Sequence, residues 1–232
     1  MSAGADRPVG FFDSGVGGKC VLDAFRRLCP DEETVYVADT AHCPYGNRPR
    51  EEIVRLSEEC VRKLLDRGCK MIVVACNTAT AAAIDVLRAN HPEVPFVGME
   101  PALKPAVQTT RSGVVGVLAT AGTFRGRLYN ATKARFAMGV SVLSTVADEF
   151  VTLVERGETA GVEVEKVVRA RVEPLLEAGA DRIVLGCTHF PHLKPVIERV
   201  CAGRAEVLDA SDAVARQARW VLDSLGLLRG SA

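Results

Sequence analysis

Short hydrophobic runs alternate with longer amphipathic segments along most of this chain. Five runs rich in β-branched residues predict strands, at residues 9–12, 34–38, 71–75, 114–118 and 182–186. Between them, residues 50–66 repeat apolar side chains at helical spacing, which predicts an amphipathic helix. This alternation is typical of an α/β protein whose strands are mostly parallel.

A weak internal repeat runs through the same pattern. In the first half, one predicted strand leads into Asp13 and a later one into Cys76. In the second half, the corresponding strands lead into residues 119–123 and into Cys187. Ligands of open α/β sheets bind at the carboxyl ends of the strands. Two such halves that face each other would therefore bring Cys76 and Cys187 together across a cleft.

The repeat predicts two pseudo-symmetric, mostly parallel α/β domains with the active site in the cleft between them. The first domain would comprise residues 1–97 plus 208–232 and carry Asp13 and Cys76. The second would comprise residues 98–207 and carry Cys187. A length of 232 residues fits two small domains.

The balance of charges argues against a nucleic-acid or membrane partner. Lys plus Arg and Asp plus Glu number 29 each, which leaves no overall basic field for nucleic acid or anionic lipid. Residues 1–8 contain neither an apolar signal core nor a membrane-spanning run. We therefore expect a cytoplasmic protein that acts on a small molecule, with no nucleic-acid or membrane partner. The eight cysteines would be reduced there, and none forms a Cys-x-x-Cys pair.

Cys76 and Cys187 suit acid–base chemistry at a carbon atom. Racemisation removes a proton from one face of Cα and returns one on the other, so a base and an acid must flank that carbon. Two thiols, one as thiolate, supply both, and a helix N-terminus favours the thiolate. Backbone N–H groups and the side chains of Asn77, Thr78 and Thr188 would hold the substrate carboxylates.

Three further side chains are candidates to orient and tune the thiols. Asp13 ends the first apolar strand, and His189 follows Cys187 by two residues. Glu155 is equally well explained as a solvated helix residue beside Arg156. The glycines after Asp13 lack the last glycine of a dinucleotide fingerprint, and its carboxylate would repel phosphate, which argues against nucleotide binding.

Four segments share a pattern with a known family. They are Asp13-Ser14-Gly15-Val16-Gly17-Gly18, Asp39-Thr40-Ala41-His42-Cys43-Pro44-Tyr45-Gly46, Ala75-Cys76-Asn77-Thr78-Ala79 and Gly186-Cys187-Thr188-His189-Phe190-Pro191. In this order, the segments resemble the signatures of the glutamate racemases, within the aspartate/glutamate racemase superfamily. The resemblance extends over nearly the whole chain. It implies two similar α/β domains, with no pyridoxal phosphate, no other cofactor and no metal.

The resemblance also implies roles for individual residues. Cys76 and Cys187 would alternate as acid and base, the first acting on D-glutamate and the second on L-glutamate. The implied substrate contacts are Asp13, Ser14, Tyr45, Gly46, Asn77, Thr78, Thr188 and His189, with Thr120 and Thr123 as weaker candidates. The implied role is to supply D-glutamate for peptidoglycan. We also expect a homodimer that forms through an apolar helix face.

Two places depart from the family pattern. Ala147-Asp148-Glu149 stands where a Cys-Pro pair is expected, which adds two carboxylates near the margin of the site and leaves the role of Glu155 open. Phe190 stands where a tyrosine is common. Glutamate and aspartate differ by one methylene, which pockets distinguish only modestly, so an aspartate racemase or another carbon-acid enzyme stays an alternative. A non-catalytic amino-acid-binding protein is a further alternative.

The other cysteines have simpler explanations. Burial as a small hydrophobe is the usual fate of a cytosolic cysteine, and it fits Cys20, Cys29, Cys60, Cys69 and Cys201. Cys43 lies inside the implied substrate loop, but no mechanism assigns it a role. A redox role for Cys76 and Cys187 is disfavoured, because a substrate carbon between the sulfurs keeps them too far apart for a disulfide.

Overall fold

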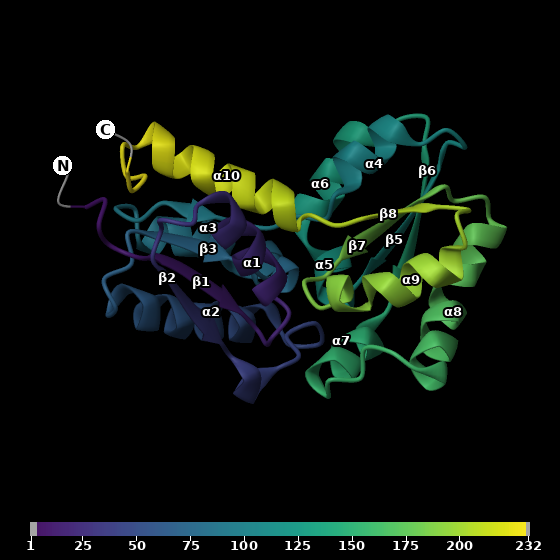
Figure 1. The fold of residues 1–232 in the computed structure, drawn as a ribbon, viewed down its shortest axis with the longest axis horizontal. Helices are drawn as coiled ribbons and strands as arrows, with labels where there is room; N and C mark the ends of the chain where they lie inside the picture. Colours follow the sequence, from purple (N-terminus) through teal and green to yellow (C-terminus); the bar gives the residue numbers. More distant parts are fainter. Residues whose placement is uncertain (1–3, 231–232) are drawn as a thin grey trace.

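Two parallel four-stranded sheets, each flanked by helices, make up the computed structural model, which describes residues 4–230 (Figure 1). The first sheet has the order β2 (Thr34–Ala38), β1 (Val9–Asp13), β3 (Met71–Val74), β4 (Phe96–Val97). The second has the order β6 (Ser141–Val146), β5 (Val114–Ala119), β7 (Arg182–Gly186), β8 (Glu206–Leu208). Both sheets thus arrange their four strands in the same sequence, and the predicted α/β fold is confirmed.

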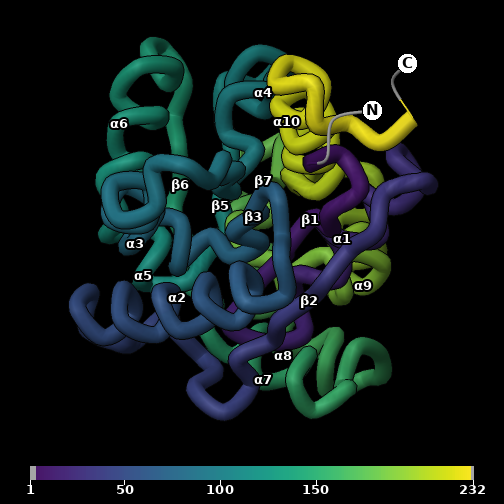
Figure 2. Tube along the Cα trace, turned by 90° about the vertical axis from the view of Figure 1, so that its left-hand side faces the viewer, coloured from purple at the N-terminus to yellow at the C-terminus, as the bar shows by residue number. Residues whose placement is uncertain are grey.

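Helices cover both faces of the first sheet. α1 (Lys19–Leu28) and α10 (Ser211–Ser224) pack together on one face, and α2 (Arg50–Leu65) and α3 (Asn77–Asn90) cover the other (Figure 2). A short 3-10 helix, η1 (Thr40–His42), follows β2. The chain therefore returns from the second sheet to place α10, yellow in Figure 1, against the first.

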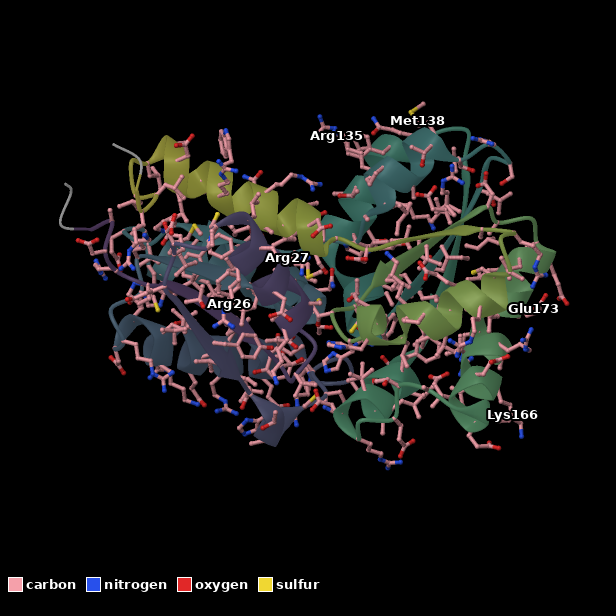
Figure 3. All side chains as sticks on the ribbon, in the orientation of Figure 1. Arg26, Arg27, Arg135, Met138, Lys166 and Glu173 are labelled. Atoms are coloured by element: carbon pink, nitrogen blue, oxygen red, sulfur yellow. The ribbon has the colours of Figure 1, made fainter. Side chains whose placement is uncertain are left out.

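The second sheet carries the remaining helices. They are α4 (Leu103–Thr109), α5 (Ala121–Arg125), α6 (Arg127–Phe136), α7 (Asp148–Glu155), α8 (Val162–Glu177), the 3-10 helix η2 (Phe190–Leu193) and α9 (Lys194–Cys201). Charged side chains of both signs extend outward from this half, such as Lys166 and Glu173 on α8 (Figure 3). No helix in residues 4–230 is long and apolar enough to cross a membrane.

The hydrophobic core is continuous between the two sheets. One cluster of buried side chains includes Phe11 and Val73 from the first sheet together with Val117 and Val184 from the second. The division at residues 97/98 and 207/208 stays a prediction, and Leu208, placed in the first domain by that division, pairs with Val184 in the second sheet.

The carboxyl ends of β1, β3, β5 and β7 position the site. These are the inner strands of their sheets, and each pairs with neighbours on both sides. Their residues are almost all buried, as expected for strands covered by helices on both faces. Asp13, Cys76, Thr120 and Cys187 lie at or just beyond these four strand ends.

Candidate active site

Cys76 forms the N-cap of α3, two residues beyond Val74, which ends β3. Its Sγ accepts a hydrogen bond from the backbone N–H of Ala79 at 3.4 Å and lies 3.6 Å from Ser14 Oγ. Burial, together with the nearby charge of Asp13, raises the pKa of Cys76 despite the Ala79 N–H. The surroundings of Cys76 therefore favour its neutral thiol, because burial outweighs the effect of the helix N-terminus.

Cys187 occupies the corresponding position after β7, in the turn before η2. Its Sγ lies 3.7 Å from His189 Nδ1, and the other ring nitrogen of His189, Nε2, lies 2.6 Å from Glu155 Oε1. Burial alone would lower the pKa of His189, but its hydrogen bonds with Cys187, Cys43 and Glu155 raise it. His189 therefore lies between Cys187 and Glu155, in surroundings that favour its protonated form.

Asp13 connects the surroundings of the two cysteines. Its carboxylate is fully buried, and Oδ2 accepts a hydrogen bond from Gly18 N at 2.9 Å. Thr188 and Ser14 approach Oδ1 with their hydroxyls, at 3.4 and 3.5 Å. Burial raises the pKa of Asp13, while the charge of His189 and the Gly18 N–H act in the opposite direction. Three of the predicted contacts thus meet at one carboxylate.

Asn77, a predicted substrate contact, has a buried side-chain amide without hydrogen-bond partners among the described residues. It is the first residue of α3 and 3% exposed, and the unpartnered atoms are both Oδ1 and Nδ2. A buried amide without partners costs about 1–3 kcal/mol, so such groups call for an explanation. A bound ligand would supply both a donor and an acceptor to this side chain.

A chain of threonine hydroxyls, beginning at Thr78, links the two halves. Thr78 Oγ1 lies 2.9 Å from Thr120 Oγ1, which in turn lies 3.1 Å from Thr123 Oγ1. All three side chains are buried. The structure thus places Thr120, a weaker candidate, in direct contact with the stronger candidate Thr78, and Thr123 in contact with Thr120.

The loop that carries Tyr45 and Gly46 contacts both halves. The Tyr45 hydroxyl donates a hydrogen bond to Asp39 Oδ2 at 2.7 Å, within the first half. Gly46 O accepts a hydrogen bond from Arg125 Nη2 at 3.0 Å, from the second half. A Cβ at Gly46 would lie 3.1 Å from Thr120 Cβ, so the absence of a side chain allows the loop to pack closely there.

The two carboxylates of the altered segment 147–149, Asp148 and Glu149, lie in different surroundings. Asp148 Oδ1 accepts a hydrogen bond from Ala121 N at 3.3 Å, at the first residue of α5, and lies beside Gly46. Glu149 instead forms an ion pair with Arg171 on α8. Only the first of the two added carboxylates borders the loop that carries Gly46.

Glu155, whose role the sequence left open, lies against His189. Its Oε1 accepts a hydrogen bond from Val16 N at 2.8 Å besides the contact with the imidazole. The hydrogen bond with His189 lowers the pKa of Glu155, with help from Val16 N and against the effect of burial. Cys43 joins this group, because its Sγ and the ligand atoms of Glu155 and His189 all lie within 4.8 Å of one another.

Known proteins share both the sequence and this arrangement of strands. Residues 19–218 match the Asp/Glu/Hydantoin racemase family. The chain is 46% identical over 229 residues to a glutamate racemase of Roseiflexus sp., covering 99% of the chain and 84% of that protein. The chain belongs to this family, among its glutamate racemases. A glutamate racemase of Herpetosiphon aurantiacus is 49% identical over 223 residues, covering 96% of the chain and 87% of the relative.

Solved structures agree with this assignment. Escherichia coli glutamate racemase in complex with L-glutamate and the activator UDP-MurNAc-ala matches with a TM-score of 0.86 and 35% identity, over 94% of this chain and 83% of that one. The Francisella tularensis enzyme in complex with D-glutamate matches with a TM-score of 0.84 and 28% identity, over 98% and 84%. The chain is thus an amino-acid racemase, while the roles of its individual residues remain predictions.

Proposed function

We propose that this racemase interconverts L- and D-glutamate without a cofactor, with Cys76 and Cys187 as alternating acid and base. The observation that carries the proposal is the equivalent position of the two thiols. Each follows the third strand of a sheet with the same strand order, and each is buried, at 4% and 7% exposure. A reaction whose substrate and product are mirror images needs such a pair, one on each face of Cα.

The protonation state of Cys76 supports a direction for each step. From L-glutamate, the Cys187 thiolate takes the Cα proton, and the electron pair left on carbon is stabilised by the adjacent carboxylate. The Cys76 thiol, whose raised pKa keeps it protonated, then delivers its proton to the opposite face. The cycle leaves Cys76 as thiolate and Cys187 as thiol, ready to act on D-glutamate in the reverse direction.

Buried polar groups would bind the ends of the substrate. The unpartnered amide of Asn77, the Ser14 hydroxyl and the hydroxyls of Thr78 and Thr188 can each donate a hydrogen bond to a carboxylate. Because both sulfurs are buried, the substrate reaches them only when the contacts between the two halves open. Closure then excludes water from the carbanion.

The biological setting is part of the same proposal. The relatives at 44–49% identity are glutamate racemases, which favours glutamate over aspartate as the substrate. We propose that the chain acts in the cytoplasm, as a homodimer, and supplies D-glutamate for peptidoglycan. Expression of the chain should then relieve the D-glutamate requirement of a bacterial strain that lacks its own racemase.

Isotope exchange tests the proposed reaction directly. Purified, reduced protein is incubated in D₂O with L-glutamate or with L-aspartate, without added cofactor, while chirality and deuterium at Cα are followed. Inversion with deuterium incorporation from glutamate alone is the expected result. Inversion of aspartate would identify the sister enzyme, and exchange from neither, in folded protein, would favour a binding protein.

A further inference from the structure

Cys43, Glu155 and His189 bring three metal-binding side chains together at the margin of the proposed active site. Their ligand atoms all lie within 4.8 Å of one another. Cys43 comes from the loop after η1, Glu155 ends α7, and His189 precedes η2, so both halves of the molecule contribute. The proposed racemisation uses no chemistry of Cys43, which leaves its thiol without an assigned role.

The spacing of the three groups suits a tetrahedral zinc ion. Zinc binds sulfur at about 2.3 Å and nitrogen or oxygen at about 2.0–2.2 Å, so its ligand atoms lie about 3.5 Å apart. The present separations lie on both sides of that value, from 2.6 Å between His189 Nε2 and Glu155 Oε1 to at most 4.8 Å within the cluster. Small side-chain rotations that bring these separations close to about 3.5 Å would place the three atoms around one ion.

The surroundings of the cluster also favour coordination. Nε2 of His189 faces Glu155, and Nδ1 lies 3.7 Å from Cys187 Sγ. An ion on Nε2 therefore leaves Nδ1–H to donate to that sulfur, as metal-bound histidines usually donate from their second nitrogen. Cys43 and Glu155 are only partly buried, so an ion can reach them from solvent.

We propose that Cys43, Glu155 and His189 bind one Zn²⁺ ion reversibly and that the bound ion blocks the active site. The inhibitory part rests on the proposed function, because the ion holds His189 and links the first half of the chain to the second. Binding releases the thiol proton of Cys43 and one proton of the imidazolium to solvent, and nothing is oxidised or reduced. A thiolate, imidazole and carboxylate set suits Zn²⁺, whereas Mg²⁺ and Ca²⁺ prefer oxygen ligands alone.

Binding is measured first, without substrate. Metal-free, reduced protein competes for Zn²⁺ with a chromophoric chelator, and we expect one ion per chain and no binding of Mg²⁺. Cys43→Ala should weaken the affinity at least about tenfold, since it removes one ligand. Cys69→Ala is the matched control, because this buried thiol lies before β3, at the end of the strand opposite Cys76. Unchanged affinity in folded Cys43→Ala, or no stoichiometric binding, would overturn the proposal.

A third variant separates this cluster from the two proposed catalytic thiols. If Cys76 and Cys187 together held the ion, Cys76→Ala would lose affinity as strongly as Cys43→Ala. The proposal instead predicts a change within about threefold for Cys76→Ala. A large loss in this variant would contradict the assignment of the ion to Cys43. With Co²⁺ in place of Zn²⁺, a sulfur-to-metal absorption band should be present in Cys76→Ala and absent from Cys43→Ala.

Inhibition is measured separately. Zn²⁺ should slow glutamate racemisation by wild-type protein, and a chelator should restore it. Measured against its own uninhibited rate, Cys43→Ala should need at least about tenfold more Zn²⁺ for half inhibition. Equal inhibition of both proteins would place the inhibitory ion elsewhere. Because affinity is measured without turnover, a failed metal titration and a failed racemase assay give distinguishable results.

Discussion

Thr188 donates a hydrogen bond from its hydroxyl to Asp13 Oδ1 over 3.4 Å, across the junction of the two halves. Asp13 ends β1, an inner strand of the first sheet, and Thr188 follows Cys187 just beyond the end of β7 in the second. A corresponding contact of 2.9 Å joins Thr120, after β5, to Thr78, which follows Cys76 by two residues. The internal repeat therefore extends to the hydrogen bonds that hold the halves together, but a carboxylate in one contact is replaced by a hydroxyl in the other.

Loss of either proposed catalytic thiol should abolish turnover in both directions. Cys76→Ala and Cys187→Ala should each reduce the racemisation of L- and of D-glutamate at least about 100-fold, because each direction needs one thiol to remove a proton and the other to return it. Polarimetry with each isomer checks this. Near-normal turnover in either folded variant would rule out the two-thiol mechanism. The control is Cys60→Ala, whose side chain is buried in the core of the first half, and it should cost about 1 kcal/mol of stability while turnover is kept.

Replacement of Asn77 should weaken substrate binding without lowering the stability of the fold. Asn77→Ala removes two buried groups that lack hydrogen bonds, so the free energy of unfolding should stay the same or rise by about 1 kcal/mol. The KM for glutamate should increase about tenfold or more, since hydrogen bonds to charged ligands are lost. Urea denaturation and initial rates measure the two effects.

Thr80→Val provides the contrast to this substitution. Thr80 is equally buried on the same helix, but its hydroxyl donates to Val74 O at 3.2 Å and accepts from Met99 N at 3.0 Å. Loss of this hydroxyl in Thr80→Val should lower the free energy of unfolding by about 1–2 kcal/mol and leave the KM for glutamate unchanged. If Asn77→Ala behaved like Thr80→Val, the amide would have a structural role instead.

The hydrophobic pattern predicted the inner strands but not three at the sheet edges. β1, β3, β5 and β7 are nearly continuous apolar runs, whereas β4 and β8 have only two and three residues. β6 has only exposed and partly buried residues, which weakens its signal. An edge strand has a partner on one side only, so its residues are less constrained by burial.

The candidate site was predictable where residues follow strand ends and unpredictable where contacts are long-range. The sequence indicated Asp13, Cys76 and Cys187 because each lies at or just beyond a predicted strand. The contact between Glu155 and His189 joins residues 34 apart through the packing of α7, and no local pattern reports it. The sequence also left open which of the two cysteines is the thiol, because the burial that raises the pKa of Cys76 depends on the whole fold.

Two neighbouring glycines should respond differently to the same substitution. A Cβ at Gly15 would lie 2.0 Å from Glu155 Oε1, the end of a flexible side chain that can move away. Gly15→Ala should therefore change stability by less than about 1 kcal/mol but lower kcat/KM about tenfold, since it breaks the contact of Glu155 with His189. A Cβ at Gly17 would lie 2.7 Å from the backbone nitrogen of His189, which cannot move freely.

Gly17→Ala should thus cost about 2–3 kcal/mol of stability. Thermal unfolding and turnover of both variants test the contrast. Equal loss of stability in the two would show that Glu155 is as firmly held as the backbone, and full activity in Gly15→Ala would exclude a role for the Glu155 contact.

A carboxylate remote from the site should control part of the acid stability. Burial by itself would raise the pKa of Asp181, but hydrogen bonds from the Thr110 hydroxyl at 2.5 Å and from the backbone N–H groups of Arg111 at 2.7 Å and Ser112 at 3.1 Å lower it to about 2. The unfolded chain takes up this proton near the ordinary value of 3.8. Because the folded pKa is the lower one, the stabilisation is complete above pH 4 and disappears as the pH falls through about 2.

Asp181→Asn should therefore unfold about 1–2 kcal/mol more easily than wild type at pH 7, and the two proteins should converge near pH 2. Turnover at pH 7 should be unchanged, because Asp181 precedes β7 and Cys187 follows the other end of that strand. Urea denaturation at a series of pH values measures the difference. A constant difference down to pH 2 would mean that the amide disturbs the packing of the turn at residues 110–112, and the charge of Asp181 would then have no part in stability.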